Sequence, residues 1–146
     1  MLRRRSRESG NNLIELALTL TFLMLVVLGT TDFARLFYMA IEVSDAARAG
    51  AQYGSQSVVT AADATGMVNA AKANAPNLAS MTASAVQCTC NTGSSVTACS
   101  TSYCTNNPKG NFVTVNTQGT FTTVAPYPGI PSSVTLSGKS VMEVGQ

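Results

Sequence analysis

The chain has 146 residues, enough for one small domain with an appendage, and only 11% of its residues are charged. Four of its nine basic residues are Arg3, Arg4, Arg5 and Arg7, and from residue 11 onward five basic and six acidic residues remain. The body of the chain therefore lacks the basic patch that binds nucleic acid. Because histidine is absent, nucleophile systems, general bases and metal sites that need histidine are excluded, and we do not expect an enzyme.

A long apolar segment follows this basic leader. Residues 16–31 are uncharged, and Leu13 and Ile14 extend the run, with Glu15 as its one acid. A helix of about 17–19 such residues just spans the hydrocarbon core of a bilayer, so we predict a membrane span at about residues 13–31. The leader arginines would keep the N-terminus in the cytoplasm and send the rest across. A buried core helix and a removable secretory signal are the alternatives, and the signal would need a small-x-small cleavage site that does not directly follow the run.

The helical pattern continues beyond the span. No proline occurs before Pro76, and we predict one helix over residues 11–54. The residues expected to share its packed face recur at three- and four-residue steps: Phe33, Leu36, Phe37, Ala40, Ser44, Ala47, Ala51 and Gly54. Residues 46–54 are rich in small side chains, which let helices approach closely. This segment would pack on the chain's own head, on neighbouring helices of an assembly, or on both.

The remaining residues, 55–146, are expected to form an exported α+β head with a thin core. A second helix is predicted at about residues 60–75, ended by Pro76. A β-hairpin is predicted from residues 112–117 and 120–125, with its turn at Gln118 and Gly119, and a last strand at 134–144.

All four cysteines lie after the membrane segment, at Cys88, Cys90, Cys99 and Cys104. An even number in a small exported head indicates two disulfides, for which three connectivities exist. We favour the nested arrangement, Cys88–Cys104 with Cys90–Cys99. A four-thiolate zinc site is the alternative, although the spacing C-x-C-x8-C-x4-C is not a usual zinc pattern.

The start of the apolar run carries a distinctive motif. The basic leader ends at Gly10, and Glu15 stands five residues later inside an otherwise apolar helix. This resembles the class III leader of type IV pilins and pseudopilins, which implies that a prepilin peptidase cuts between Gly10 and Asn11 and removes residues 1–10. The new α-amino group, from the same or an adjacent subunit, would offer a partner to the Glu15 carboxylate, which is costly at membrane depth. The alternative is a Glu15 side chain that reaches the interface of an uncleaved anchor.

Three longer stretches indicate one particular family among the pilin-like proteins. They are residues 12–18 (Asn-Leu-Ile-Glu-Leu-Ala-Leu), 28–38 (Leu-Gly-Thr-Thr-Asp-Phe-Ala-Arg-Leu-Phe-Tyr) and 46–53 (Ala-Ala-Arg-Ala-Gly-Ala-Gln-Tyr). Together they resemble the TadE-like family of the Tad (Flp) tight-adherence pilus system, over about residues 9–54. Two residues depart from the family pattern, because Thr21 stands near the usual proline and Leu16 follows the glutamate where phenylalanine is common.

The resemblance implies a minor pilin or pseudopilin that helps to assemble an adhesive bacterial pilus. Its implied partners are the inner membrane, a prepilin peptidase, other pilins or pseudopilins and the Tad assembly platform, without a cofactor, nucleic acid or small-molecule substrate. The mature chain would sit in the cytoplasmic membrane with its head in the periplasm or outside, or enter the pilus. The alternatives are a pseudopilin of another type IV or type II secretion machine, and an uncleaved single-span protein whose head binds a surface ligand.

Overall fold

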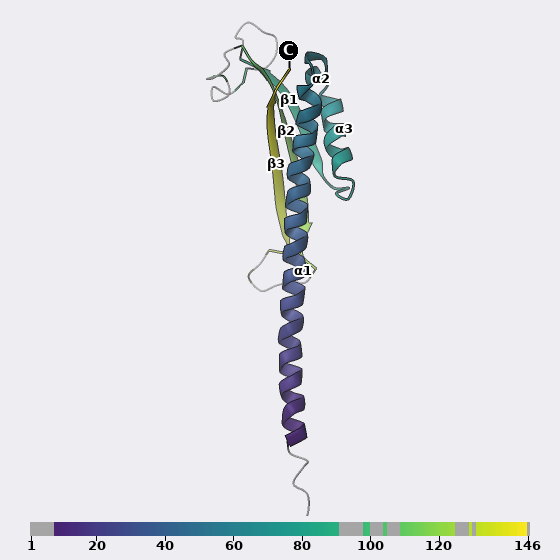
Figure 1. Ribbon diagram of the computed structural model, residues 1–146, viewed down its shortest axis with the longest axis vertical. Coiled ribbons are helices and arrows are strands. Elements are labelled where there is room, and N and C mark those ends of the chain that lie inside the picture. Colours follow the sequence, from purple (N-terminus) through teal and green to yellow (C-terminus); the bar gives the residue numbers. More distant parts are fainter. Residues whose placement is uncertain are drawn as a thin grey trace, which may run out of the picture. The chain divides into compact units, whose positions relative to one another are not determined.

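The computed structural model describes residues 8–90, 98–99, 104, 109–124, 129 and 131–145, with side chains from residue 11 onward. In chain order these form α1 (Glu8–Ser55), α2 (Val58–Ala62), α3 (Ala64–Asn74), β1 (Thr82–Thr89), β2 (Asn111–Thr122) and β3 (Ser133–Glu143) (Figure 1). The chain divides into two compact units, Met1–Leu36 and Phe37–Gln146. The predicted α+β class with a long N-terminal helix is confirmed.

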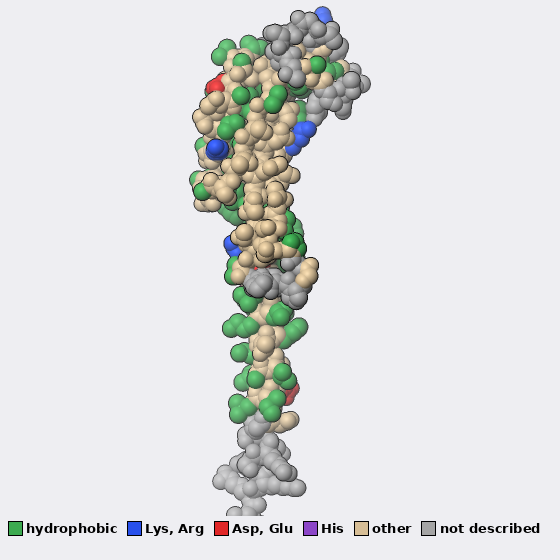
Figure 2. All heavy atoms as spheres, turned by 180° about the vertical axis from the view of Figure 1, so that it is seen from behind, with side chains coloured by type: hydrophobic (Ala, Val, Ile, Leu, Met, Phe, Trp, Pro, Cys, Tyr) green, Lys and Arg blue, Asp and Glu red, His purple; other side chains and the backbone are tan. Residues whose placement is uncertain are grey.

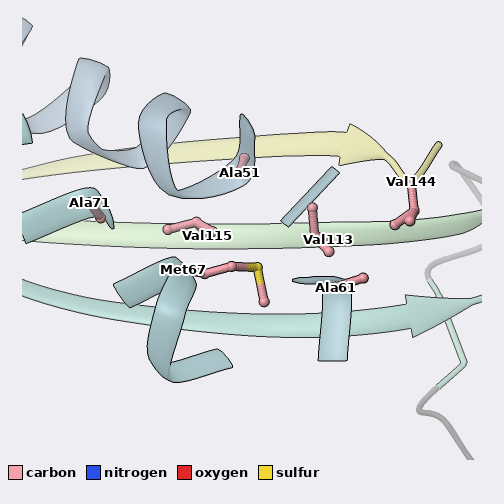
Figure 3. Packing of buried hydrophobic residues seen from close by; sticks show 7 residues of the cluster. All are labelled: Ala51, Ala61, Met67, Ala71, Val113, Val115 and Val144. Carbon is pink, nitrogen blue, oxygen red and sulfur yellow. The ribbon is translucent and has the colours of Figure 1, made fainter. Parts of the chain in front are cut away.

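The second unit is built on a three-stranded antiparallel sheet in the order β1-β2-β3. The central strand β2 pairs with β3 from Phe112↔Glu143 to Thr122↔Ser133 and with β1 along the whole of β1. Alternate residues of β2 are buried, as expected for a sheet that is covered on one face. The main core cluster brings the helices onto this face and consists mostly of small side chains: Ala51, Ala61, Met67, Ala71, Val113, Val115 and Val144 (Figure 3).

The second half of α1 belongs to this core. Its buried positions are Met39, Val43, Ala46, Ala47, Gly50, Ala51 and Gly54. The face predicted from the sequence is therefore right at Ala47, Ala51 and Gly54 but wrong at Phe33, Phe37 and Ser44, which are exposed. Small side chains decide the packed face because they let the helix backbone come close to its neighbours: a Cβ on Gly50 would lie 2.8 Å from the carbonyl oxygen of Met67. The small-residue segment thus packs on the chain's own head.

The predicted second helix is divided at Asp63. Ser57 caps α2 through a reciprocal pair of hydrogen bonds with Thr60. Asp63 follows α2 and caps α3, since its carboxylate accepts a hydrogen bond of 2.8 Å from the Gly66 amide. The Tyr53 hydroxyl donates to the same carboxylate at 3.1 Å. This hydrogen bond and the negative charge of Asp63 raise the pKa of Tyr53 above its ordinary value.

The hairpin predicted at Gln118 and Gly119 is wrong, because β2 runs straight through both residues. Gly119 serves a close approach instead of a turn: a Cβ there would lie 2.8 Å from Met39 Cε on α1. Two residues earlier, on the same face of the sheet, the buried Thr117 hydroxyl donates to the carbonyl oxygen of Val43 at 2.6 Å. The last predicted strand is confirmed as β3, whereas β1 was not predicted.

Candidate functional site

The N-terminal part of α1 has the surface of a membrane helix. Its large apolar side chains are exposed from Leu13, at 66%, to Leu28, at 45%, and Figure 2 shows hydrophobic side chains projecting on both sides of this stretch. The helix is long and apolar enough to cross a bilayer, and its most apolar window is 0% buried. Large exposed apolar surfaces are unfavourable in water and favourable in lipid. The apolar N-terminal helix therefore indicates a single-pass membrane protein.

The threonines of this helix suit a span because their hydroxyls bond to the helix backbone. Thr19 donates to the Glu15 carbonyl at 2.9 Å, Thr21 to the Ala17 carbonyl at 2.8 Å and Thr31 to the Val27 carbonyl at 2.8 Å. A hydroxyl satisfied in this way needs no water, which lowers the cost of placing it in hydrocarbon. At Thr21 the helix is uninterrupted, as expected for a position without proline.

The residues of the expected processing motif lie at the start of α1. Because α1 begins at Glu8, the bond between Gly10 and Asn11 lies in the first helical turn. Asn11 and Glu15 are both exposed, and their spacing of four residues places them on the same side of the helix. The leader residues Arg3, Arg4, Arg5 and Arg7 lie outside the described residues.

One ion pair follows the uncharged run. Arg35 Nη1 lies 3.2 Å from Asp32 Oδ1, with the Asp32 side chain 7% exposed and that of Arg35 50% exposed. A second pair of the same spacing, Asp45 and Arg48, is exposed and longer at 4.0 Å. Pairing compensates the charge of Asp32 and Arg35 close to the apolar segment.

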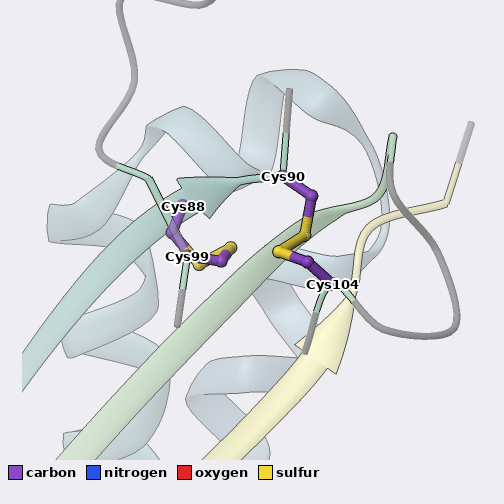
Figure 4. The surroundings of a disulfide bond; sticks show 4 residues. All are labelled: Cys88, Cys90, Cys99 and Cys104. Atoms are coloured by element: carbon purple, nitrogen blue, oxygen red, sulfur yellow. A yellow bond between two sulfur atoms is a disulfide. The ribbon is translucent and has the colours of Figure 1, made fainter. Parts of the chain in front are cut away.

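The two disulfides lie at the far end of β1 (Figure 4). They join Cys88 to Cys99 and Cys90 to Cys104. The prediction of two disulfides is confirmed, but the nested pairing Cys88–Cys104 with Cys90–Cys99 is wrong.

The crossed pairing follows from the direction in which the chain returns. A nested pair requires an antiparallel, hairpin-like return, whereas Ala98 forms a parallel bridge with Thr89. The Cys99 amide also donates to the Thr89 carbonyl at 3.0 Å. When the two segments run parallel, the earlier cysteine of one meets the earlier cysteine of the other, so Cys88 pairs with Cys99 and Cys90 with Cys104.

The same cysteines are the one group among the described residues whose atoms are arranged for a metal ion. The sulfurs of Cys90, Cys99 and Cys104 lie within 4.8 Å of one another. Zinc binds thiolates, however, and all of these sulfurs are in disulfides. The zinc alternative would require their complete reduction.

Comparison with known proteins gives one match. The family described as TadE-like protein matches residues 13–52, which is most of α1. No curated protein and no solved structure matches the chain. The match covers the segment on which the sequence resemblance rests, so this chain carries the TadE-like N-terminal segment that its sequence indicates.

Proposed function

We propose that this chain is a structural protein of Tad pilus biogenesis, a TadE-like minor pilin or pseudopilin. A prepilin peptidase would cut it between Gly10 and Asn11, on the cytoplasmic side of the inner membrane. The apolar helix would remain with the mature protein, and the disulfide-bonded head would lie in the periplasm or outside. Other pilins or pseudopilins and the Tad assembly platform would be its partners.

The observation that carries this proposal is the TadE-like segment at residues 13–52. The exposed apolar surface of the same segment supports it, since a chain that keeps this helix after processing needs lipid or other subunits to cover it. The head offers little for catalysis. From residue 55 onward its acids are Asp63, which caps α3 and accepts from Tyr53, and Glu143.

Gly10 also supports the cleavage site. Peptidases act on extended backbone, and glycine costs about 1 kcal/mol in a helix relative to alanine. At the start of α1, where a helix frays, Gly10 lowers the cost of unwinding the bond to Asn11. The leader can thus be presented without disturbing the apolar helix that follows.

The mature N-terminus tests this proposal directly. We expect intact mass measurement of the membrane-associated and sheared-surface protein to show a chain that begins at Asn11. Gly10→Val should block processing and leave the full precursor in the membrane, because a branched side chain at the scissile bond both fills the peptidase site and resists unwinding. Gly29→Val is the matched control, since a Cβ at Gly29 meets nothing within 4 Å. A wild-type chain that begins at Met1 would contradict processing and favour the uncleaved surface-binding anchor.

Glu15→Leu is expected to insert into the membrane but not to be processed or incorporated normally. Removing an acid at membrane depth lowers the cost of insertion. The peptidase then meets a leader motif without its acid, and any chain that is cut lacks the partner of its new α-amino group. Insertion is measured by resistance to alkaline extraction, processing by intact mass, and incorporation by the amount recovered in the sheared-surface fraction. Glu15→Asp keeps the charge and should retain part of the processing and incorporation. Wild-type behaviour of Glu15→Leu in all three measurements would show that this carboxylate has no role in assembly.

A further inference from the structure

The surface of α1 remains apolar well beyond the predicted end of the membrane span. Between Glu15 and Glu42 the charged residues are Asp32 and Arg35, which pair with each other. A helix of about 26 residues between these two glutamates is about 39 Å long. That length matches the roughly 40–45 Å of a bilayer with its headgroup layers, whereas the span predicted at about residues 13–31 accounts only for the hydrocarbon core.

Large apolar side chains are exposed at the outer end of this interval. In the second compact unit, Phe37 is 64% exposed, Tyr38 59% and Ile41 60%. From residue 44 onward the exposed positions of α1 are polar or charged: Ser44, Asp45, Arg48 and Gln52. The chemistry of the exposed side of α1 thus changes within a few residues around Glu42.

We propose that the membrane–water boundary at the C-terminal end of the span crosses α1 between Phe37 and Glu42. Phe37, Tyr38 and Ile41 then bind in the lipid headgroup layer. Aromatic residues are enriched at this depth because their rings are apolar and their polar ends reach water. The Tyr38 hydroxyl is bonded to Glu42 Oε1 at 3.3 Å, so its polar end points towards the first charge after the boundary. Asp32 and Arg35 then lie just inside the boundary, where pairing lowers their cost.

Lipid fits this surface better than the helix of a second copy. Helix–helix contacts in membranes favour small residues, which allow close backbone approach. Most small residues of this half of α1 are turned towards the chain's own head: Ala46, Ala47, Gly50, Ala51 and Gly54 are buried, Ala40 and Ala49 are partly buried, and Ser44 is exposed. The exposed side offers bulky rings and a branched aliphatic chain instead. The inference depends on the membrane helix and not on the proposed role in the pilus, so it holds for an uncleaved chain as well.

The chain contains no tryptophan, which allows a sharp depth measurement. Phe37→Trp introduces a single reporter into the full chain, reconstituted in phosphatidylcholine vesicles brominated either near the headgroup or deep in the acyl chains. Leu23→Trp marks the span, and Val59→Trp marks an exposed apolar position on α2, 76% exposed, away from the proposed boundary. All three sites are exposed, so none of the substitutions disturbs the core.

We expect Phe37→Trp to lose about half of its emission to shallow bromines and little to deep ones, as a ring in the headgroup layer should. Leu23→Trp should be quenched mainly by deep bromines, and Val59→Trp by neither. The proposal is overturned if Phe37→Trp resembles Val59→Trp, or if it is quenched mainly by deep bromines. The proposal is also overturned if the emission of Phe37→Trp shifts to the blue as the protein-to-lipid ratio is raised, while neither bromine position quenches it. A second copy of the chain would then cover the ring.

Discussion

Replacing Gly50 with leucine is expected to prevent the head from folding. Gly50 lies where α1 crosses α3 and β2, and even a Cβ there would lie 2.8 Å from the Met67 carbonyl oxygen, 3.1 Å from Val115 Cγ1 and 3.2 Å from Ala71 Cβ. The first of these neighbours is backbone, so the clash cannot be relieved by a side-chain rotation. A leucine needs space for three further carbons, and we expect a loss of more than about 4 kcal/mol in the free energy of unfolding.

Gly29→Leu is the matched control on the same helix, because a Cβ at Gly29 meets nothing within 4 Å. Circular dichroism and protease resistance of the full chain in detergent should show a folded head for Gly29→Leu and an unfolded one for Gly50→Leu. Equal stability of the two variants would mean that α1 does not pack on the head at Gly50.

Loss of either disulfide is expected to cost the head about 3 kcal/mol, since each closes a loop of 11 or 14 residues. The effect is large for this head because the main core cluster consists only of alanine, valine and one methionine. The two loops overlap in sequence, so removal of both should cost less than the sum. Urea unfolding of the full chain, with and without a thiol reductant, measures the loss of stability. The double variant Cys88→Ala/Cys99→Ala removes one disulfide and leaves Cys90–Cys104 in place.

Peptide mapping without reduction should recover Cys88 with Cys99 and Cys90 with Cys104. Recovery of the nested pairs would contradict the parallel return at Ala98. A chain whose unfolding midpoint does not respond to reductant would show that the disulfides contribute nothing to stability.

The parts of the fold that depend on local pattern could be predicted from the sequence. The absence of proline before Pro76 and the apolar composition predict α1, and the alternation after residue 133 predicts β3. Gly119 was misinterpreted because glycine serves both turns and close approaches, and only the position of Met39 on the facing helix distinguishes the two. β1 was missed because its inward residues include Ala83 and Ala85, too small to give a strand its hydrophobic signal.

In the candidate site, too, the features that depend on consecutive residues could be predicted, and those that depend on the arrangement of distant segments could not. The membrane helix and the TadE-like motif are properties of consecutive residues, and both were visible in the sequence. The cysteine pairing depends on the direction of a returning segment, which spacing does not encode. The packed face of α1 was predicted from three- and four-residue spacing, which includes Phe37 and omits Ala46, whereas the tight approach to the sheet selects the smallest side chains.

The burial of Val43, Ala46 and Ala51 against the sheet bears on how the head can be isolated. A fragment cut after Ser55, at the end of α1, would lose one wall of its core and expose Val113 and Val115 to water. A soluble fragment has to begin near Phe37, where the second compact unit starts. The segment that emerges from the apolar helix is thus a structural part of the head and cannot be replaced by a flexible tether.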